Sequence, residues 1–183
     1  MAGALVIVDM QGFVADRIGR GIEAHPADAI ENMKTLLAHA RRGGETVVHV
    51  RHQTSAEGSL LHKDAPLAQP ADGFEAAAGE PVFIKNTSSA FSSTGLLSYL
   101  RERKMSACTV IGAVAGFCVN STVRSGADAG LSMTVVSDAV LSFALEEAGQ
   151  GARQILDVTL ALLAADFATV LTTTELLAAS GER

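Results

Sequence analysis

The sequence predicts an α/β protein of three layers, in which helices cover both faces of a six-stranded, mostly parallel β-sheet. Short runs rich in valine, isoleucine and threonine alternate with segments of helical periodicity along nearly the whole chain. This order favours parallel strands, because a helix is the usual connection between two of them. The chain has 183 residues, of which 48% are hydrophobic, so a single domain spanning 1–183 with an ample core is expected.

Six short apolar runs are the predicted strands. Residues 4–8 (ALVIV) are continuously apolar, which is typical of a strand buried on both faces of a sheet. The run 46–50 (TVVHV) is rich in β-branched residues, which favour strands. The remaining four strands are expected at 82–84, 108–112, 133–137 and 168–172.

Helical periodicity separates these runs. Pro26 favours the first turn of a helix over 26–42, and Gly43 and Gly44 end its apolar pattern. A serine at 92 or 93 can cap the next helix. Two more helices are expected at 117–130 and 145–164, whereas 52–80 is expected to form a long surface loop.

Composition excludes several classes of partner. The formal net charge is −6 and no basic block is present, so neither a nucleic acid nor a membrane surface is an expected partner. No stretch approaches the roughly 18 uncharged apolar residues of a membrane span. We recognise no signal peptide, and two cysteines do not make a disulfide framework. A cytoplasmic protein with reduced thiols is therefore expected.

Chemically capable side chains follow the predicted strands. In a parallel sheet the working residues gather beyond the carboxyl ends of the strands. Five side chains with acid, base or thiol groups occupy such places in this chain. They are Asp9, His52 (after Arg51), Lys85, Cys118 and Asp138. Each alone has an ordinary structural explanation, but together they predict a site at this edge of the sheet.

Cys118 is the predicted nucleophile. It lies near the first turn of a helix, where free N–H groups and the helix dipole favour a thiolate. The N–H groups of this glycine-containing loop could also hold an oxyanion. Asp9 is the candidate base and Lys85 the candidate positive charge, because no histidine is placed to form a papain-like pair with the thiol. Cys108 lies inside a strand and is expected to be a buried core residue without a chemical role.

Four segments resemble one family along nearly the whole chain. They are VIVDMQGF (6–13), KNTSSAFSSTGLLSYLR (85–101), VIGAVAGFCVNSTVRSGADAGLSMTVVSDAV (110–140) and TVLTTTELL (169–177). Several separated motifs in the same order make the match specific. The chain is similar to the isochorismatase-like cysteine hydrolases, which include nicotinamidases, N-carbamoylsarcosine amidohydrolases and related amidases.

The resemblance implies both a fold and a site. The fold would be that of the isochorismatase-like hydrolases, and the catalytic triad would be Asp9, Lys85 and Cys118. The peptide bond between Ala113 and Val114 would be cis, and the N–H groups of Val114 and Cys118 would form the oxyanion hole. The resemblance also implies a homo-dimer or homo-tetramer.

The sequence departs from the family pattern in places that bear on metals. Nicotinamidases carry an Asp-x-His motif after the second strand, whereas this chain has His49, His52 and His62 without that motif. We therefore expect no metal, no cofactor and no activity on nicotinamide. The opening DMQGF lacks a second acid, and Ala115 stands where a threonine is common.

Five residues near the strand ends are candidates for the substrate pocket. For the phenylalanines, a core or dimer contact is an equally open alternative, and His52 could instead be an exposed loop residue. The candidates are Gln11, Phe13, His52, Phe91 and Phe117.

Three functions are compatible with these features. The favoured one is a hydrolase that cleaves a small amide or carbamoyl-type C–N bond through a thioester on Cys118. One alternative is vinyl ether hydrolysis of the isochorismatase type without a covalent intermediate. The presence of the nucleophilic Cys118 argues against it. Another is a non-catalytic binding or assembly protein of the same fold. The presence of all three triad residues argues against it.

Overall fold

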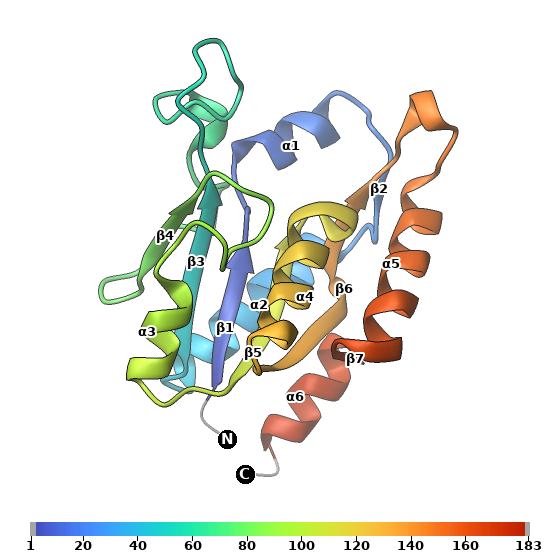
Figure 1. Cartoon of the computed structure of the whole chain (residues 1–183). Coiled ribbons are helices and arrows are strands. Elements are labelled where there is room, and N and C mark those ends of the chain that lie inside the picture. The colour runs from blue at the N-terminus through green and yellow to red at the C-terminus, as the bar shows by residue number, and fades with distance from the viewer. Residues whose placement is uncertain (1–2, 182–183) are drawn as a thin grey trace.

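A seven-stranded sheet forms the centre of the molecule, as the computed structural model of residues 3–181 shows (Figure 1). The strand order is β2-β6-β5-β1-β3-β4, and β7 also pairs with β6. Every pairing is parallel except that of β2 with β6. The strands are β1 (Gly3–Val8), β2 (Ala24–His25), β3 (Thr46–His52), β4 (Val82–Lys85), β5 (Ala107–Ala113), β6 (Ser132–Phe143) and β7 (Thr169–Leu171).

Helices cover both faces of this sheet, as predicted. They are α1 (Gly12–Gly19), α2 (Ala29–Arg42), α3 (Leu96–Glu102), α4 (Asn120–Asp128), α5 (Ala152–Asp166) and α6 (Thr173–Gly181). A π-helical turn, η2 (Ala115–Val119), precedes α4, and two short 3₁₀ turns are η1 (Pro66–Ala68) and η3 (Glu146–Ala148).

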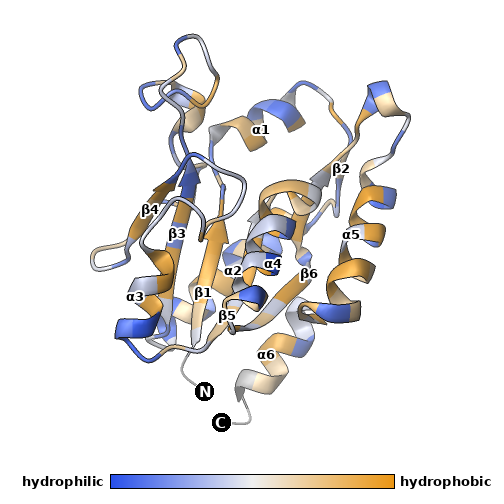
Figure 2. Ribbon diagram, in the orientation of Figure 1, coloured by the Kyte–Doolittle hydropathy of each residue, from blue (hydrophilic) through white to orange (hydrophobic). Residues whose placement is uncertain are grey.

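Strand β1 shows how the two faces are built. Its alternate residues Val6 and Val8 belong to a core shared with α3, α4 and α5, whereas Leu5 and Ile7 belong to a core shared with α1 and α2. Figure 2 shows β1 as hydrophobic over most of its length. The continuous apolar pattern therefore follows from burial on both faces, because successive side chains of a strand point to opposite sides.

The structure differs from the predicted element list in several places, and its sheet has seven strands instead of the predicted six. Strand β2 has two residues and α1 has eight, so neither is long enough to show a clear period in the sequence. The helix expected over 145–164 begins only at Ala152, since Gly149 adopts a left-handed conformation (φ 64°) before it. Helix α6 was not predicted, because its region carries little amphipathic pattern.

Strand β6 is longer than predicted, and this corrects the place of Asp138. Val135 and Val140 of β6 pair with Val110 and Gly112 of β5, so four residues lie between the paired positions of β6 and only one lies between those of β5. Asp138 lies in the bulge between these pairs and not beyond the strand end. Its Oδ1 accepts hydrogen bonds of 2.8 Å from the backbone N–H and the hydroxyl of Thr173, at the start of α6. Asp138 therefore anchors a helix.

Exposed apolar side chains gather along α5 and near it. They are Phe117, Leu145, Val158 and Leu162. A helix surface of this kind is compatible with a contact between chains, and the homo-oligomer stays a prediction. No helix in residues 3–181 is both long and apolar enough to cross a membrane, and the cytoplasmic location also stays a prediction.

Candidate active site

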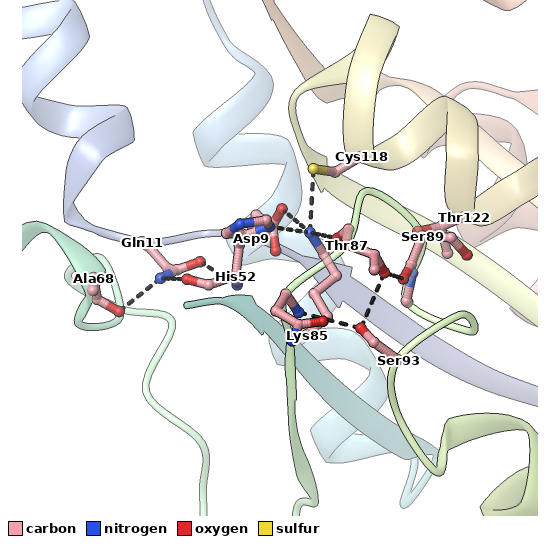
Figure 3. A network of polar contacts seen from close by, with 12 residues as sticks. Asp9, Gln11, His52, Ala68, Lys85, Thr87, Ser89, Ser93, Cys118 and Thr122 are labelled. Carbon is pink, nitrogen blue, oxygen red and sulfur yellow. Dashed lines mark hydrogen bonds and ion pairs between the residues drawn. The ribbon is translucent and has the colours of Figure 1, made fainter. Parts of the chain in front are cut away.

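Four predicted site residues meet at the carboxyl edge of the sheet (Figure 3). Asp9 follows β1, His52 and Lys85 end β3 and β4, and Cys118 lies on η2 after β5. These strands are neighbours in the order β5-β1-β3-β4. Parallel neighbours bring their carboxyl ends to one edge, and this is why residues more than one hundred positions apart come into contact.

Lys85 occupies the centre of the cluster. Its side chain is fully buried. The ammonium Nζ lies 2.7 Å from Asp9 Oδ2 and 3.2 Å from Cys118 Sγ. It also lies 3.1 Å from His52 Nδ1 and 3.2 Å from the carbonyl oxygen of Thr87. One positive charge thus bridges the carboxylate and the sulfur.

Asp9 is a buried carboxylate in an unusual backbone position. It has a positive φ of 51°, which turns the chain sharply after β1, and its N–H donates to Val50 O at 2.9 Å. Burial raises the pKa of Asp9, and the Lys85 ammonium opposes this rise. Its Oδ1 has no hydrogen-bond partner among residues 3–181. Asp9 is therefore a stronger base than an exposed aspartate.

The thiol of Cys118 differs from the sequence-based expectation. Burial, together with the Asp9 carboxylate, raises its pKa to about 11, although the Lys85 ammonium acts in the opposite direction. The expectation that the helix start would favour a thiolate is therefore wrong for the resting protein, because desolvation outweighs it. The sulfur needs a base beside it, and Asp9 is in that place. Cys108, as predicted, is buried in the core.

Gly112 allows β5 to approach β1 just before the nucleophile loop. Its φ is +122°, and a Cβ there would collide with the carbonyl oxygen of Val8. Only glycine accepts this conformation and this distance. The peptide bond between Ala113 and Val114 that follows is cis.

Gln11 lies behind the cluster and does not line a pocket. It is fully buried, and its Oε1 accepts a 2.8 Å hydrogen bond from His52 N. Its Nε2 donates to His52 O at 2.9 Å and to Ala68 O at 2.7 Å. The expectation of a substrate contact is corrected accordingly: Gln11 fixes the backbone of His52 and ties the long loop to the end of β3.

The three candidate phenylalanines have different surroundings. Phe13 and Phe91 are partly buried and pack against the cores on opposite faces of the sheet. Phe117 is 51% exposed. It lines a hollow of about 370 Å³ with Leu145 and Ile155, on the side of η2 that faces α5. Their role as pocket walls stays a prediction.

The three histidines of the second-strand region do not converge. The Nε2 of His49 lies 2.8 Å from Oε2 of Glu80, and His62 lies beside Asp64 on the long loop. In residues 3–181, the only group spaced to hold a metal is Asp9, His52 and Cys118. The Lys85 ammonium already lies within 3.2 Å of an atom of each of these three residues. Their positive partner is therefore this lysine, and the three residues do not fit an added metal cation.

Thr87 is a member of the cluster that the sequence did not single out. Its carbonyl accepts from Lys85, and its hydroxyl lies 3.0 Å from Ser93 Oγ, which accepts from Asn86 N at 3.2 Å. The hydroxyl also donates to Ser89 O at 3.1 Å. The run of small hydroxyl residues after Lys85 was the available signal, since serine and threonine often bond to nearby backbone in turns.

Solved structures share this architecture over the whole chain. A protein assigned to the isochorismatase family from Chromobacterium violaceum superposes with a TM-score of 0.92, at 26% identity, over 99% of this chain and 94% of that one. An isochorismatase from Pseudomonas putida superposes with a TM-score of 0.84, at 30% identity, over 95% and 89%. The α/β architecture is thus that of isochorismatase-like hydrolase structures.

Relatives of known sequence point the same way. The isochorismatase family protein YrdC of Bacillus subtilis is 28% identical over 95% of this chain and 94% of its own length. The secreted isochorismatase effector Isc1 of Verticillium dahliae is 30% identical over 94% and 88%. The ureidoacrylate amidohydrolase RutB of Cronobacter sakazakii is 30% identical over 67% of each chain.

The isochorismatase domain matches residues 3–175, which include every residue of the cluster. This match covers nearly all of the chain and agrees with both the shared architecture and the predicted motifs. The chain therefore belongs to the isochorismatase family of hydrolases.

Proposed function

We propose that the protein is a cysteine-dependent amidohydrolase that cleaves a small amide or carbamoyl-type C–N bond through a thioester on Cys118. The observation that carries this proposal is the Asp9–Lys85–Cys118 cluster, in which the buried ammonium lies 2.7 Å from the carboxylate and 3.2 Å from the sulfur. A nucleophile, a base and a fixed positive charge are the groups that acyl transfer to sulfur requires.

The first half of the reaction forms the thioester. Asp9 takes the thiol proton while Cys118 Sγ bonds to the carbonyl carbon, and the charge develops on the carbonyl oxygen. The N–H groups of Val114 and Cys118 are the proposed donors to that oxygen. Asp9 then returns the proton to the departing nitrogen as the C–N bond breaks, so that ammonia or an amine leaves. The pKa of Asp9 is raised, so its carboxyl group binds the thiol proton more tightly than an exposed aspartate would. The protonated carboxyl group can then act as the acid that gives this proton to the departing nitrogen.

The second half restores the thiol. Water attacks the thioester carbon, Asp9 accepts a proton from that water, and the C–S bond breaks. The proton then returns to the sulfur, and the product is a carboxylic acid or, for a carbamoyl compound, a carbamic acid. Throughout, Lys85 stabilises whichever of the two neighbours carries negative charge.

Similarity to RutB supports the C–N bond as the target. The name of that relative is ureidoacrylate amidohydrolase, and its match to this chain spans 67% of both proteins. The nucleophilic cysteine also favours this chemistry over vinyl ether hydrolysis, which needs no covalent intermediate. A small-molecule substrate is proposed, because Asp9 and Lys85 are buried and Cys118 is partly buried.

The experiment is a screen of small amides, ureido acids and carbamoyl compounds for release of ammonia or amine. Active mixtures are quenched in acid and analysed by mass spectrometry for an acyl adduct on Cys118. We expect turnover and the adduct in the wild type, and neither in Cys118→Ala. Cys108→Ala is the matched control, and it should retain both because that thiol is buried away from the cluster. Turnover by Cys118→Ala would rule out the covalent route.

A second test needs no substrate. Alkylation of Cys118 by iodoacetamide is followed from pH 4.5 to 8.5 in the wild type, Asp9→Asn and Lys85→Met. We expect both substitutions to slow alkylation at least tenfold, for different reasons. Lys85→Met removes the cation that opposes the rise in the pKa of Cys118, whereas Asp9→Asn removes the base that takes the thiol proton as the sulfur reacts. If Cys118 reacts at the wild-type rate in both variants, the cluster does not activate the thiol.

A further inference from the structure

We propose that His52 is a positioning residue for this reaction: its neutral imidazole accepts a hydrogen bond from the Lys85 ammonium through Nδ1, holds Nζ between Asp9 and Cys118, and releases it when the imidazole is protonated. The inference rests on the proposed function and adds a residue outside the predicted triad. It also adds a pH response that the triad alone does not have.

The number of protons on Lys85 makes the imidazole important. An ammonium has three N–H groups, whereas Nζ has four neighbours within 3.2 Å: Asp9 Oδ2, His52 Nδ1, Cys118 Sγ and Thr87 O. In the resting protein the sulfur carries its own proton and is only a weak acceptor, so the carboxylate, the imidazole and the carbonyl compete with it for the three N–H groups. When the thiolate forms, one N–H turns to the sulfur while the others keep Nζ in place.

This arrangement requires a defined state of the histidine. Lys85 is fully buried and presents only donors, so Nδ1 must present a lone pair and the imidazole proton must be on Nε2. An imidazolium would have an N–H at Nδ1, directed at the ammonium only 3.1 Å away. The two cations cannot remain at this distance in a buried site, so protonation moves Lys85, His52 or both.

The charged groups around His52 favour its neutral form. Lys85 faces it from β4, Asp9 from the turn after β1, and the thiol of Cys118 from η2. Burial, and next the Lys85 ammonium, lowers the pKa of His52, whereas the Asp9 carboxylate and the Thr87 carbonyl oppose this. Arg51 precedes it on β3 and, by strand alternation, points to the other face of the sheet. The pKa of His52 therefore lies below 6.5, the ordinary value for histidine.

The backbone of His52 is held as firmly as its ring. Gln11 accepts from its N–H at 2.8 Å and donates to its carbonyl at 2.9 Å. Because this amide is itself fully buried, the end of β3 cannot shift to relieve a repulsion between His52 and Lys85. The repulsion must then be relieved by movement of the His52 ring or of the Lys85 ammonium. Movement of the ammonium takes away the cation that stabilises the thiolate.

The experiment compares His52→Asn with His52→Leu. The asparagine Oδ1 can take the place of Nδ1 as acceptor but does not titrate, whereas leucine offers no acceptor. The readout is the rate of alkylation of Cys118 by iodoacetamide from pH 4.5 to 8.5, together with thermal unfolding to check the fold. His62→Asn is the matched control, since His62 lies on the long loop beside Asp64.

At pH 8 we expect His52→Asn to react within about threefold of the wild type and His52→Leu to react at least tenfold more slowly. Below pH 6.5 the wild-type rate should fall as two groups protonate, His52 and Asp9. In His52→Asn only Asp9 remains, so the fall should follow one protonation instead of two and be less steep. His62→Asn should match the wild type throughout.

Three results would overturn the inference. One is a folded His52→Leu with the wild-type rate, a second is a His52→Asn profile identical to that of the wild type, and a third is a folded His52→Asn as slow as His52→Leu. These failures are separable from failure of the proposed function. If Asp9→Asn and Lys85→Met also left the rate unchanged, the amidohydrolase mechanism itself would be wrong.

Discussion

Replacing Lys85 by methionine should destabilise the protein by about 3–5 kcal/mol at pH 8, the usual cost of breaking a buried ion pair by removing one partner. Methionine has nearly the length of lysine but carries no charge. Both members of the pair are almost inaccessible to solvent, with the lysine side chain 0% and the Asp9 side chain 3% exposed. The substitution leaves a buried carboxylate without its cation.

The structure also predicts how this loss depends on pH. Burial raises the pKa of Asp9, and the ammonium limits that rise, so the pKa of Asp9 must rise further in the variant. A carboxyl group with a raised pKa binds a proton more tightly in the folded state than in the unfolded state. The stability that it contributes is present at low pH and is lost as pH rises through the folded pKa. The deficit of Lys85→Met should therefore be small in acid and grow with pH.

The assay is urea unfolding of both proteins at several pH values. A deficit of about 3–5 kcal/mol corresponds to a loss of roughly two to four powers of ten in the folding equilibrium constant. The double variant Asp9→Asn, Lys85→Met completes a mutant cycle. Asparagine tolerates the positive φ of this position. With both charges absent, the double variant should be more stable at pH 8 than Lys85→Met alone.

Two results would refute this reasoning. If Lys85→Met lies within about 1 kcal/mol of the wild type at pH 8, the carboxylate is not left unpaired in a low-dielectric site. If the double variant loses the sum of the two single losses, the two groups do not interact in the folded protein.

Three further predictions follow from other contacts. Gly112→Ala should lose at least about 4 kcal/mol in the free energy of unfolding, or prevent folding, because a Cβ would collide with the Val8 carbonyl; urea unfolding or soluble yield measures this. Gln11→Leu should lose about 2–4 kcal/mol, since it leaves buried backbone groups of His52 and Ala68 unpaired, and should slow alkylation of Cys118. Glu80→Gln should lose about 2 kcal/mol at pH 7, because this carboxylate binds Arg41. The pKa of Glu80 is lowered from 4.5 to about 2, so its stabilisation is lost as pH falls through that range, and the stabilities of wild type and variant should converge there.

The sequence predicted the elements that bear the site with good accuracy. Strands β1, β3 and β5 appear as apolar or β-branched runs, because a strand buried in a parallel sheet needs such side chains. Strand β4 is also an apolar run, although it lies at the edge of the sheet and exposes Val82 and Ile84. The order of these strands along the chain predicted parallel pairing, and parallel pairing predicted that the residues after them would meet. Asp9, Lys85 and Cys118 are together for this reason.

Features that depend on contacts between distant segments could not be predicted from the sequence. Strand β2 exists because two residues pair with the end of β6, and Asp138 lies in a bulge that only the register with β5 creates. Gln11 looked like a pocket residue because it follows a strand, but the long loop covers it.

The sequence by itself determined the α/β class, the layering and the chemical groups at the strand ends, because these depend on local hydrophobic pattern and chain order. Only the tertiary structure decided the protonation states. Burial raises the pKa of Cys118 and lowers that of His52, and the positions of Asp9 and Lys85 modify both. Desolvation and charge proximity arise when strands far apart in the chain come together, so a pattern of neighbouring residues does not carry them.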